Sequence, residues 1–583
     1  MRLDVTRGDA SEALEEADCE LSRVQDDPLR VRWLGKVPYS EAHLLQRALH
    51  AKPNTRYLLL LEHPPVFTMG VRARAEHVLV DPREAGVGIV HADRGGDVTY
   101  HGPGQLVGYV IVPVPPRSGS VPRHVHDIEQ VVVDALGDLG VSGVTLRDGY
   151  PGVWIASGSG ALKKVCAVGV KVAHGRSMHG FALNINTDLE HFRQIVPCGL
   201  HGTEVTSLEN ESMSVSMAEV VDAIVMRAVD KWAPSGIYER QEVSFHRAQV
   251  QRRQMKSAQG VPRRSDPDLG KALEVGSPVA QAPPSEIPLG SAKPIWLRAR
   301  AQMGEGYMNV GRTMRELGLV TVCVEAGCPN IFECWESGTA TFMINGDRCT
   351  RACGFCLIDT SRPLPIDPAE PSRVADAVAR MDLEYAVVTA VARDDLADGG
   401  ASGFARTIDA IRDRCPHTAV EVLIPDCKGD ADALGVIFAA RPDVLNHNIE
   451  TVARLQRTVR PSARYARSLS VLALAKDAGL VAKSGMLLGI GERFDEVVGA
   501  LADLRAVGVE IVTLGQYLRP TAKHLPVARW WRPEELDELA RIGMDMGFAH
   551  VQASPFTRSS YHASEAKRAA SGQRIPLNTT LAR

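Results

Sequence analysis

Residues 340–356 read ATFMINGDRCTRACGFC, where an apolar run of strand length leads directly into three closely spaced cysteines. Further strand-like apolar runs begin near residues 384, 418, 443, 480, 509 and 550. Helical patterns fill most of the intervals between them, for example over Ser372–Asp382, Leu469–Ala478 and Asp495–Val507. Because strands that alternate with helices form parallel sheets, the C-terminal half is predicted to be a full or partial (β/α) barrel.

Polar side chains recur where these strands end. The cysteines of residues 349–356 follow the first strand, and Arg393, Asp394 and Asp395 follow the second. Asp426 comes at the end of the third strand, and Glu450 follows the fourth. Chemistry in (β/α) barrels takes place at the carboxyl ends of the strands, so we expect the site of this half there.

The composition excludes several classes of protein. The 583 residues include 66 Lys plus Arg against 70 Asp plus Glu, so no basic excess indicates nucleic acid as a partner. The longest apolar runs, such as Tyr57–Leu61, fall far short of the ~20 residues that span a bilayer. An acidic N-terminal extension, residues 1–28, lacks the apolar core of a signal peptide. We therefore expect a cytoplasmic protein with neither a nucleic acid nor a membrane as its partner.

One shift in composition divides the chain. Residues 240–292 are rich in Gln, Arg, Ser and Pro and have few aromatic residues, which is typical of a flexible linker between residues 29–239 and 293–583. A surface excursion within one domain is the alternative, although loops of this length are uncommon in compact domains. Since such a linker only tethers its domains, we expect both halves to stay active when it is cut.

The N-terminal half mixes strands and helices without regular alternation. Arg56–Leu61 and Gln105–Pro113 have strand-like apolar runs, and Asp127–Leu139 has a helical apolar face that ends at a glycine. This pattern favours an α+β domain with a mixed sheet, and hence an α/β multidomain protein overall.

Six of the eleven cysteines fall between Cys323 and Cys356. Cys349, Cys353 and Cys356 have the spacing Cys-x3-Cys-x2-Cys, which can direct three thiolates at one iron–sulfur cluster and leave one iron open. In a reducing compartment such clusters of cysteine indicate metal or catalytic roles rather than disulfides. Zinc is the alternative, although structural zinc usually takes four ligands.

This spacing, followed by a βα barrel, resembles the radical S-adenosylmethionine superfamily, in which the barrel is a partial one of the TIM type. The resemblance implies that the open iron binds S-adenosyl-L-methionine. One electron from an external donor then cleaves this cofactor to methionine and a 5′-deoxyadenosyl radical.

A second triplet and a C-terminal motif narrow the resemblance to lipoyl synthase. CVEAGCPNIFEC holds Cys323, Cys328 and Cys334, and RSSY spans residues 558–561. With DLADGGASGF, these motifs extend the similarity over residues 293–570. The resemblance implies two 4Fe–4S clusters: one on Cys349, Cys353 and Cys356, and an auxiliary one on the second triplet with Ser560. Taken alone, Ser560 would be an ordinary surface serine.

Cys198, in the N-terminal half, lies in VPCGL, a context that predicts a turn and hence an accessible thiol. A free cysteine is as often a small buried hydrophobic residue. A nucleophilic cysteine needs a nearby cation to favour its thiolate. The candidate cations are Lys163, Lys164, Lys171, His101 and His179.

Four strings over residues 29–235, RGGDVTYHGPGQ, KKVCAVGVKV, HGFALNI and VPCG, resemble lipoyl(octanoyl) transferase. The resemblance implies that Cys198 forms the acyl thioester with Lys164 as its partner, while Cys166 only packs. It implies the fold of the biotin and lipoyl protein ligases, a mixed sheet with helices on one side. The residues expected to contact substrate are Arg94, Gly95, Gly96, Asp97, Val98, Thr99, Tyr100, His101, Ala167, Val168, Gly169, Gly180, Phe181 and Ala182.

Together the two resemblances imply a bifunctional enzyme of lipoate assembly. Its N-terminal half would move an octanoyl group from octanoyl-acyl carrier protein to a lysine of a lipoyl domain, in 2-oxoacid dehydrogenases or the glycine cleavage H protein. Its C-terminal half would insert sulfur at carbons 6 and 8. Two alternatives stay open: fusion of an acyltransferase to another two-cluster radical sulfur inserter, and a zinc-stabilised module that docks lipoyl domains.

Overall fold

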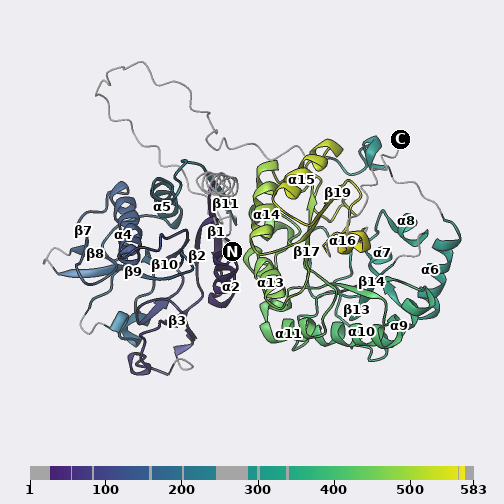
Figure 1. Cartoon of the computed structure of the whole chain (residues 1–583), viewed down its shortest axis with the longest axis horizontal. Helices are drawn as coiled ribbons and strands as arrows, with labels where there is room; N and C mark the ends of the chain where they lie inside the picture. Colours follow the sequence, from purple (N-terminus) through teal and green to yellow (C-terminus); the bar gives the residue numbers. More distant parts are fainter. Residues whose placement is uncertain are drawn as a thin grey trace, which may run out of the picture.

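The computed structural model describes residues 27–53, 55–81, 85–156, 161–199, 203–243, 287–298, 303–336, 340–561 and 563–570. They form two halves that lie side by side (Figure 1). The acidic extension expected over residues 1–28 lies almost wholly outside the described residues, and so does most of the linker expected over 240–292. No helix in the described part of the chain has the length and apolar character needed to cross a membrane.

The N-terminal half is built on a mixed sheet of eight strands in the order β11-β1-β2-β6-β10-β9-β8-β7. Strand β1 runs parallel to both β2 and β11, and the remaining neighbours are antiparallel. The strands are β1 (Leu29–Lys36), β2 (Arg56–Glu62), β6 (Gln105–Ile111), β7 (Val144–Leu146), β8 (Val153–Ala156), β9 (Leu162–Ala173), β10 (Arg176–Asn184) and β11 (Tyr238–Glu242). The mixed sheet predicted from the sequence is confirmed. A second sheet joins β3 (Val66–Met69), β4 (Gly88–His91) and β5 (Val98–His101).

Helices cover both faces of the large sheet, so the prediction of helices on one side was wrong. Helices α4 (Ser120–Asp138) and α5 (Met217–Trp232) pack on the face to which Leu58 and Leu60 of β2 point. Helix α2 (Tyr39–His50) packs on the opposite face, with Leu59 and Leu61. The run RYLLLLE of β2 is apolar on both sides because neither side of this strand faces water.

The C-terminal half is an open (β/α) barrel. Strands β13 to β19 are parallel, and β12 (Val320–Thr321) adds an antiparallel edge. Among the described residues no pairing joins β19 back to β12 or β13, so the barrel is partial. The parallel strands are β13 (Thr341–Ile344), β14 (Tyr385–Ala390), β15 (Ala419–Leu423), β16 (Val444–Asn446), β17 (Ala482–Leu488), β18 (Ile511–Gln516) and β19 (His550–Ser554), which confirms every strand predicted for this half.

Helices alternate with these strands along the outside of the barrel (Figure 1). They are α9 (Glu370–Arg380), α10 (Ala401–Arg414), α11 (Ala431–Ala439), α13 (Tyr465–Asp477), α14 (Phe494–Ala506) and α15 (Pro533–Asp545), with α16 (Ala563–Ala570) near the C-terminus. Before the barrel, α6 (Glu305–Glu316), α7 (Val322–Glu325) and α8 (Ile331–Glu336) form the segment that carries the first three clustered cysteines.

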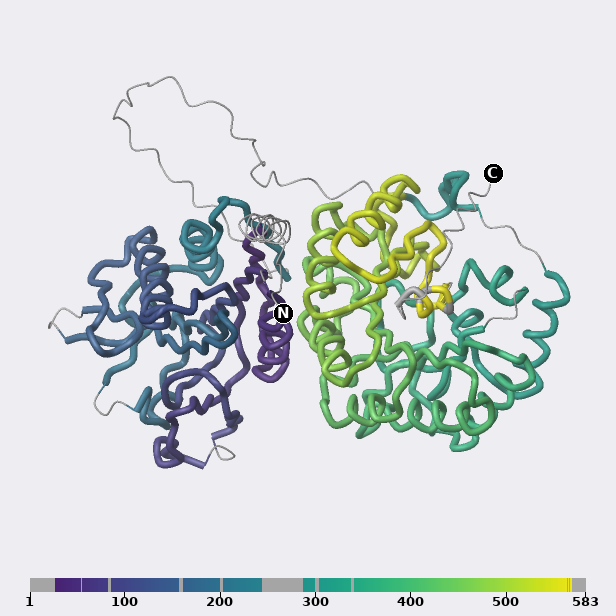
Figure 2. Tube along the Cα trace, in the orientation of Figure 1, coloured from purple at the N-terminus to yellow at the C-terminus, as the bar shows by residue number. Residues whose placement is uncertain are grey.

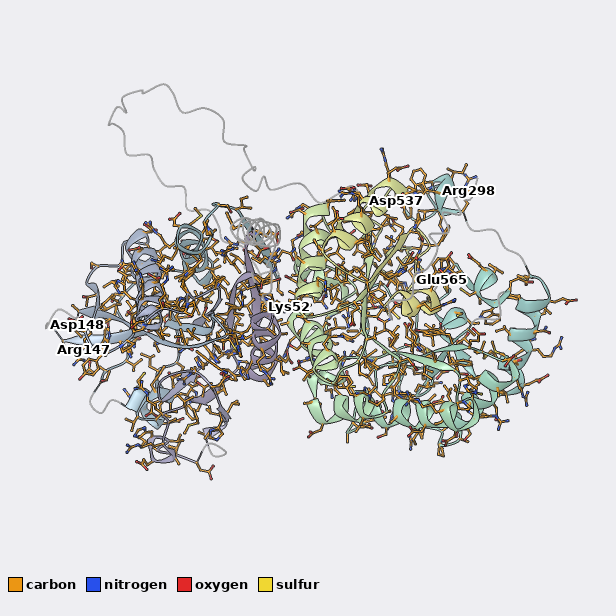
Figure 3. All side chains as sticks on the ribbon, viewed as in Figure 1. Lys52, Arg147, Asp148, Arg298, Asp537 and Glu565 are labelled. Atoms are coloured by element: carbon orange, nitrogen blue, oxygen red, sulfur yellow. The ribbon has the colours of Figure 1, made fainter. Side chains whose placement is uncertain are left out.

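The two halves share a hydrophobic core. Leu45 and Leu49 of α2 join the same buried cluster as Leu469 and Leu472 of α13. The purple tube of α2 runs beside the yellow-green tubes of α13 and α14, and Lys52, just after α2, lies at the junction (Figures 2 and 3). The linker is therefore not the only connection between the halves.

Arg32 of β1 and Asp503 of α14 form a buried ion pair across this junction. Arg32 Nε donates to Asp503 Oδ2 at 2.8 Å, and both side chains are almost fully buried. The hydroxyls of Tyr57 and Tyr465 donate to the same carboxylate, at 3.3 and 3.0 Å. One carboxylate thus collects donors from both halves.

Asp503→Ala is expected to lower the free energy of unfolding by about 3–5 kcal/mol, because it leaves the Arg32 charge buried without its main carboxylate. Urea unfolding of the full chain measures the loss. Asp477→Asn is the matched control, since Asp477 lies 3.9 Å from Arg47 across the same junction with both side chains exposed. Equal stability of the two variants would contradict a structural role for the buried pair.

Candidate active sites

A cavity of about 720 Å³ opens in the N-terminal half where β9, β10 and the segment before β5 meet. Every residue expected to contact substrate lines it except Val98 and Tyr100. Those two are buried in a separate small core with Phe67, because successive residues of β5 point to opposite sides. Thr99 and His101, which alternate with them, face the cavity.

Cys198 and Lys164 meet inside this cavity, with 3.6 Å between Sγ and Nζ. Cys198 lies in the short turn Pro197–Gly199 with a left-handed φ of +58°, in agreement with the predicted turn. Lys164 comes from β9 and is buried against the ring of Trp154, 5.0 Å from its centroid. Gly152 leaves room for it, since a Cβ there would lie 2.8 Å from Lys164 Cε.

The other candidate cations have partners of their own. Lys171 Nζ donates to Asp93 at 2.7 Å, and His179 Nε2 lies 2.7 Å from the same carboxylate. His101 Nδ1 lies 2.7 Å from Gln105, and Lys163 Nζ lies 3.6 Å from Glu211. Lys164 is thus the candidate that the structure brings to Cys198. Cys166 is fully buried and packs in the core.

Four buried polar atoms of cavity-lining residues lack a hydrogen-bond partner among the described residues. They are Tyr39 Oη, Arg94 Nε, Thr99 Oγ1 and His179 Nδ1. The other nitrogens of Arg94 are held in place, with Nη2 donating at 2.7 Å to both the carbonyl and the hydroxyl of Thr68. A buried donor left in this way fits an oxygen of a bound substrate.

Several residues of the first cavity could not be predicted from the sequence. His77 Nδ1 lies 2.8 Å from Asp97, and a Cβ on Gly199 would lie 2.6 Å from Asp97 Oδ2, which places this pair directly beside Cys198. Arg72, Arg74 and Tyr150 also line the cavity. They occur in no recognisable motif, and only the folding of separate loops brings them together.

A second cavity, of about 370 Å³, lies at the carboxyl ends of the barrel strands. Both cysteine triplets contribute to its wall, through Cys323, Cys328, Cys349, Cys353 and Cys356, and so does Ser560. Cys334 is not a lining residue, but it lies close to the other two cysteines of its triplet: burial, with the charges of Cys328 and Cys323, raises its pKa to about 12. The structure thus has a cavity at the end of the barrel where the site of this half was expected.

The main chain holds the loop of residues 349–356 from several sides. Cys349 N donates to Asp359 O at 2.8 Å, and Gly354 N donates to Val459 O at 2.9 Å. His524 Nε2 lies 2.9 Å from Cys356 O. The loop is thus fixed by segments that follow three different parts of the barrel.

The donor set of this cavity fits iron–sulfur clusters. No disulfide joins any of the six cysteines of the two triplets, all of which the structure describes. Burial raises the pKa of Cys353 and, to about 12, that of Cys356, so these thiols would stay protonated until a metal binds and displaces their protons. Thiolates are the ligands that hold iron–sulfur clusters, and a loop with three of them leaves one iron for another ligand.

Polar groups face the cysteines across the cavity. Asn448 Nδ2 donates to Glu450 Oε1 at 3.0 Å and to Ser559 Oγ at 2.6 Å, and Arg460 Nη1 donates to Asn448 O at 2.9 Å. Burial raises the pKa of Glu450, and Arg460 opposes the rise. This wall can bind a small molecule with both charged and apolar parts.

The fold and these two cavities define a two-part transferase, with a thiol–amine pair in one half and a radical S-adenosylmethionine centre in the other. Residues 38–228 match the family model of the lipoyl protein ligase A/B catalytic domain, and residues 343–504 match that of the radical SAM superfamily. Lipoyl synthase from Rubrobacter xylanophilus is 56% identical over 288 residues, which are 48% of this chain and 90% of that protein. Lipoyl synthase from Mycobacterium avium is 55% identical over 282 residues, 48% of this chain and 92% of that one.

The chain belongs to the lipoyl synthase family through its C-terminal half, with a lipoyl protein ligase A/B-type catalytic domain fused before it. It is an enzyme of lipoate biosynthesis that uses radical S-adenosylmethionine chemistry and 4Fe–4S clusters. A bipartite lipoate protein ligase from Thermoplasma acidophilum, solved with its E2 lipoyl domain, superposes on 37% of this chain and 88% of its own. That match has a TM-score of 0.32 and 17% identity. Both resemblances expected from the motifs are confirmed.

Proposed function

We propose that the N-terminal half transfers an octanoyl group from octanoyl-acyl carrier protein through Cys198 to a lysine of a lipoyl domain. The C-terminal half then inserts sulfur at carbons 6 and 8 of that chain. The observation that carries the proposal is the 3.6 Å contact of Cys198 with Lys164 inside a cavity, in a chain whose other cavity is lined by both cysteine triplets.

In the first transfer, the Cys198 thiolate attacks the octanoyl thioester of the carrier protein. A new thioester forms on Sγ, and the carrier leaves as a thiol that takes a proton from Lys164. The amine of the lipoyl-domain lysine then attacks this thioester and loses a proton to Lys164, an amide forms, and Cys198 leaves as its thiolate. Lys164 Nζ is the group positioned to favour the thiolate at each stage. Arg94 Nε and Thr99 Oγ1 are donors for the carbonyl oxygen.

In the C-terminal half, Cys349, Cys353 and Cys356 would hold one 4Fe–4S cluster, beside which S-adenosyl-L-methionine would bind. When bound, the two supply a radical that removes hydrogen from the unactivated octanoyl chain. The side chains of Glu450, Arg460 and Asn448 face the cysteines and would orient the charged part of the cofactor. An external donor would supply the electron.

Cys323, Cys328, Cys334 and Ser560 would hold a second, auxiliary 4Fe–4S cluster that gives up the sulfur. Cys323, Cys328 and Ser560 line the same cavity as the first triplet, so a substrate there would reach both sites. A serine oxygen is a weaker ligand for iron than a thiolate, which suits a cluster that is consumed. Lipoyl domains of 2-oxoacid dehydrogenases and the glycine cleavage H protein would carry the acyl chain.

Incubation of the anaerobically prepared protein with an octanoylated lipoyl-domain peptide tests the whole proposal. We expect a product with two added sulfur atoms by mass spectrometry. A single sulfur or a methylthio group would instead indicate another two-cluster radical sulfur inserter. Iron and sulfide analysis separates the remaining alternative, because a zinc-stabilised docking module would contain neither.

Ser560→Ala is expected to abolish sulfur insertion while 5′-deoxyadenosine still forms, because it removes the proposed oxygen ligand of the auxiliary cluster only. Ser559→Ala is the matched control: Ser559 accepts a hydrogen bond from Asn448 and is not a proposed ligand. Counting iron per chain and sulfur in the product distinguishes the two variants. Full sulfur insertion by Ser560→Ala would remove Ser560 from the ligand set.

A further inference from the structure

Helix α2 contacts both the cavity that contains Cys198 and the C-terminal half of the chain. On one side, Tyr39 lines the transferase cavity, and Gln46 Oε1 accepts a hydrogen bond from His179 N at 2.9 Å. On the other side, Glu41 points into the C-terminal half, where Ser470 Oγ donates to its carbonyl at 2.8 Å. One helix of twelve residues thus joins both parts of the protein.

Glu41 is buried at this junction and ion-paired across it. Arg467 Nε of α13 donates to Glu41 Oε1 at 2.8 Å, and Glu41 is 5% exposed. Gly429 makes the approach possible: a Cβ there would lie 3.1 Å from Glu41 Oε1, and its φ is +78°. Burial raises the pKa of Glu41, and Arg467 opposes that rise. The C-terminal half therefore provides a binding pocket for this side chain, with a cation and the room to reach it.

The contacts continue from Arg467 to the cysteine loop. Arg467 Nη1 lies 3.5 Å from Asp426 Oδ2, and Arg351 Nη2 donates to Asp426 Oδ1 at 2.7 Å. Arg351 also forms a two-pronged pair with Asp394, at 2.7 and 2.8 Å. Arg351 lies between Cys349 and Cys353, and its main-chain N–H donates to Cys349 Sγ at 3.4 Å.

Asp426 is shared between two arginines. It is completely buried, and Arg351 contacts one of its oxygens while Arg467 lies near the other. While Glu41 accepts from Arg467, Asp426 can give its short contact to Arg351. Without the Glu41 charge, Arg467 would be drawn fully onto Asp426, and Arg351 would lose part of its anchor. The balance depends on a carboxylate that the other half of the protein supplies.

We propose that Glu41 is a positioning residue for the cysteine loop of the C-terminal half, acting through Arg467, Asp426 and Arg351. Docking of the transferase half then increases the affinity of the radical centre for S-adenosylmethionine. This goes beyond the proposed function and rests on it for the assignment of Cys349, Cys353 and Cys356 to the cluster that binds this cofactor.

The test is Glu41→Gln in the full, cluster-loaded chain, because glutamine keeps the shape and can still accept from Arg467 but lacks the charge. We expect the KM for S-adenosylmethionine, measured by 5′-deoxyadenosine formation, to rise about five- to tenfold, with a smaller change in kcat. Binding of S-adenosylmethionine should shift the electron paramagnetic resonance signal of the reduced protein. In Glu41→Gln this shift should require a correspondingly higher concentration of the cofactor. Acylation of Cys198 reports that the N-terminal half is folded.

Asp477→Asn is the matched control, since this exposed residue lies at the same junction but outside the ion-pair series; its KM should equal that of the parent. Should Glu41→Gln not fold, Glu41→Asp replaces it, because the shorter side chain draws the carboxylate away from Arg467, and a smaller rise in the same KM is expected. A folded variant with the parent's KM and spectrum overturns the proposal. Failure of the parent itself to cleave the cofactor would refute the proposed function instead.

A protease site inserted between residues 260 and 270 allows the covalent link between the halves to be cut. The effect of their non-covalent contact can then be measured by itself. After cutting, the halves of the parent should elute together in gel filtration and keep the parent's KM, because they share a core. Glu41→Lys, which sets a cation against Arg467 and Arg464, should let the cut halves separate and should raise the KM. Separation without any change in KM would show that docking does not position the loop.

Discussion

Alanine in place of Cys349, Cys353 or Cys356 is expected to abolish cleavage of S-adenosylmethionine, because each change removes one of only three proposed thiolate ligands. Alanine in place of Cys323, Cys328 or Cys334 should abolish sulfur insertion and leave some 5′-deoxyadenosine formation. The difference follows from the proposed ligand sets, which come from separate segments and contribute five of their six cysteines to the wall of one cavity.

Iron content, electron paramagnetic resonance and product analysis of the six variants distinguish these outcomes. Each set should lose about one four-iron cluster and keep the other. Cys415→Ala is the matched control, since Cys415 is a free cysteine of the same half that lines neither cavity. If both sets lost the same single cluster, the assignment of two sites would be wrong.

An octanoyl thioester is expected on Cys198 when the protein is mixed with octanoyl-acyl carrier protein, and Cys198→Ala should form none. Lys164→Met should slow acylation about 10²- to 10⁴-fold, because the thiol loses the ammonium group that lies 3.6 Å from it and methionine fills much of the same space. Intact-mass measurements over time follow both reactions.

Lys163→Met is the matched control for the lysine. It changes the adjacent residue of the same strand, whose ammonium group lies near Glu211 and Glu204 rather than the thiol. We expect it to acylate at close to the parent rate. Equal rates for Lys164→Met and Lys163→Met across the pH range would remove Lys164 from the acyl-transfer step.

The barrel strands could be predicted because each is a short apolar run that the turn residues around it delimit. Helix boundaries were less accurate where proline and polar residues fill the first turns of a helix. Helix α4 begins at Ser120 rather than Asp127: Val121 and Val125 continue its apolar spacing, but Pro122 and several polar residues lie among them.

The residues of the candidate sites also differ in how far the sequence could predict them. The cysteine triplets are close in sequence, so their spacing alone predicted a shared site. Lys164 was one of five candidate cations until the resemblance selected it, and the structure shows why the others are far from equivalent: each has another partner. His77 could not be found, because its place beside Cys198 depends on how distant loops pack.

The contact between the halves had no signal in the sequence. Arg32, Glu41 and Asp503 are charged residues of the kind that usually face water, and nothing in their spacing shows that they are buried. The composition of residues 240–292 indicated independent domains. Only the three-dimensional fit of α2 against α13 shows that the charges find partners across the junction.

The position of α2 has a consequence for any attempt to produce the transferase half alone. Leu45 and Leu49, now covered by α13, would form an apolar stripe open to water, flanked by Arg32 without Asp503 and by Glu41 without Arg467. Apolar stripes of that kind promote self-association and aggregation. If this fragment were insoluble, the cause would be the missing C-terminal half rather than a defect in the acyl-transfer cavity. Solubility could be restored by polar substitutions on that one stripe, far from Cys198.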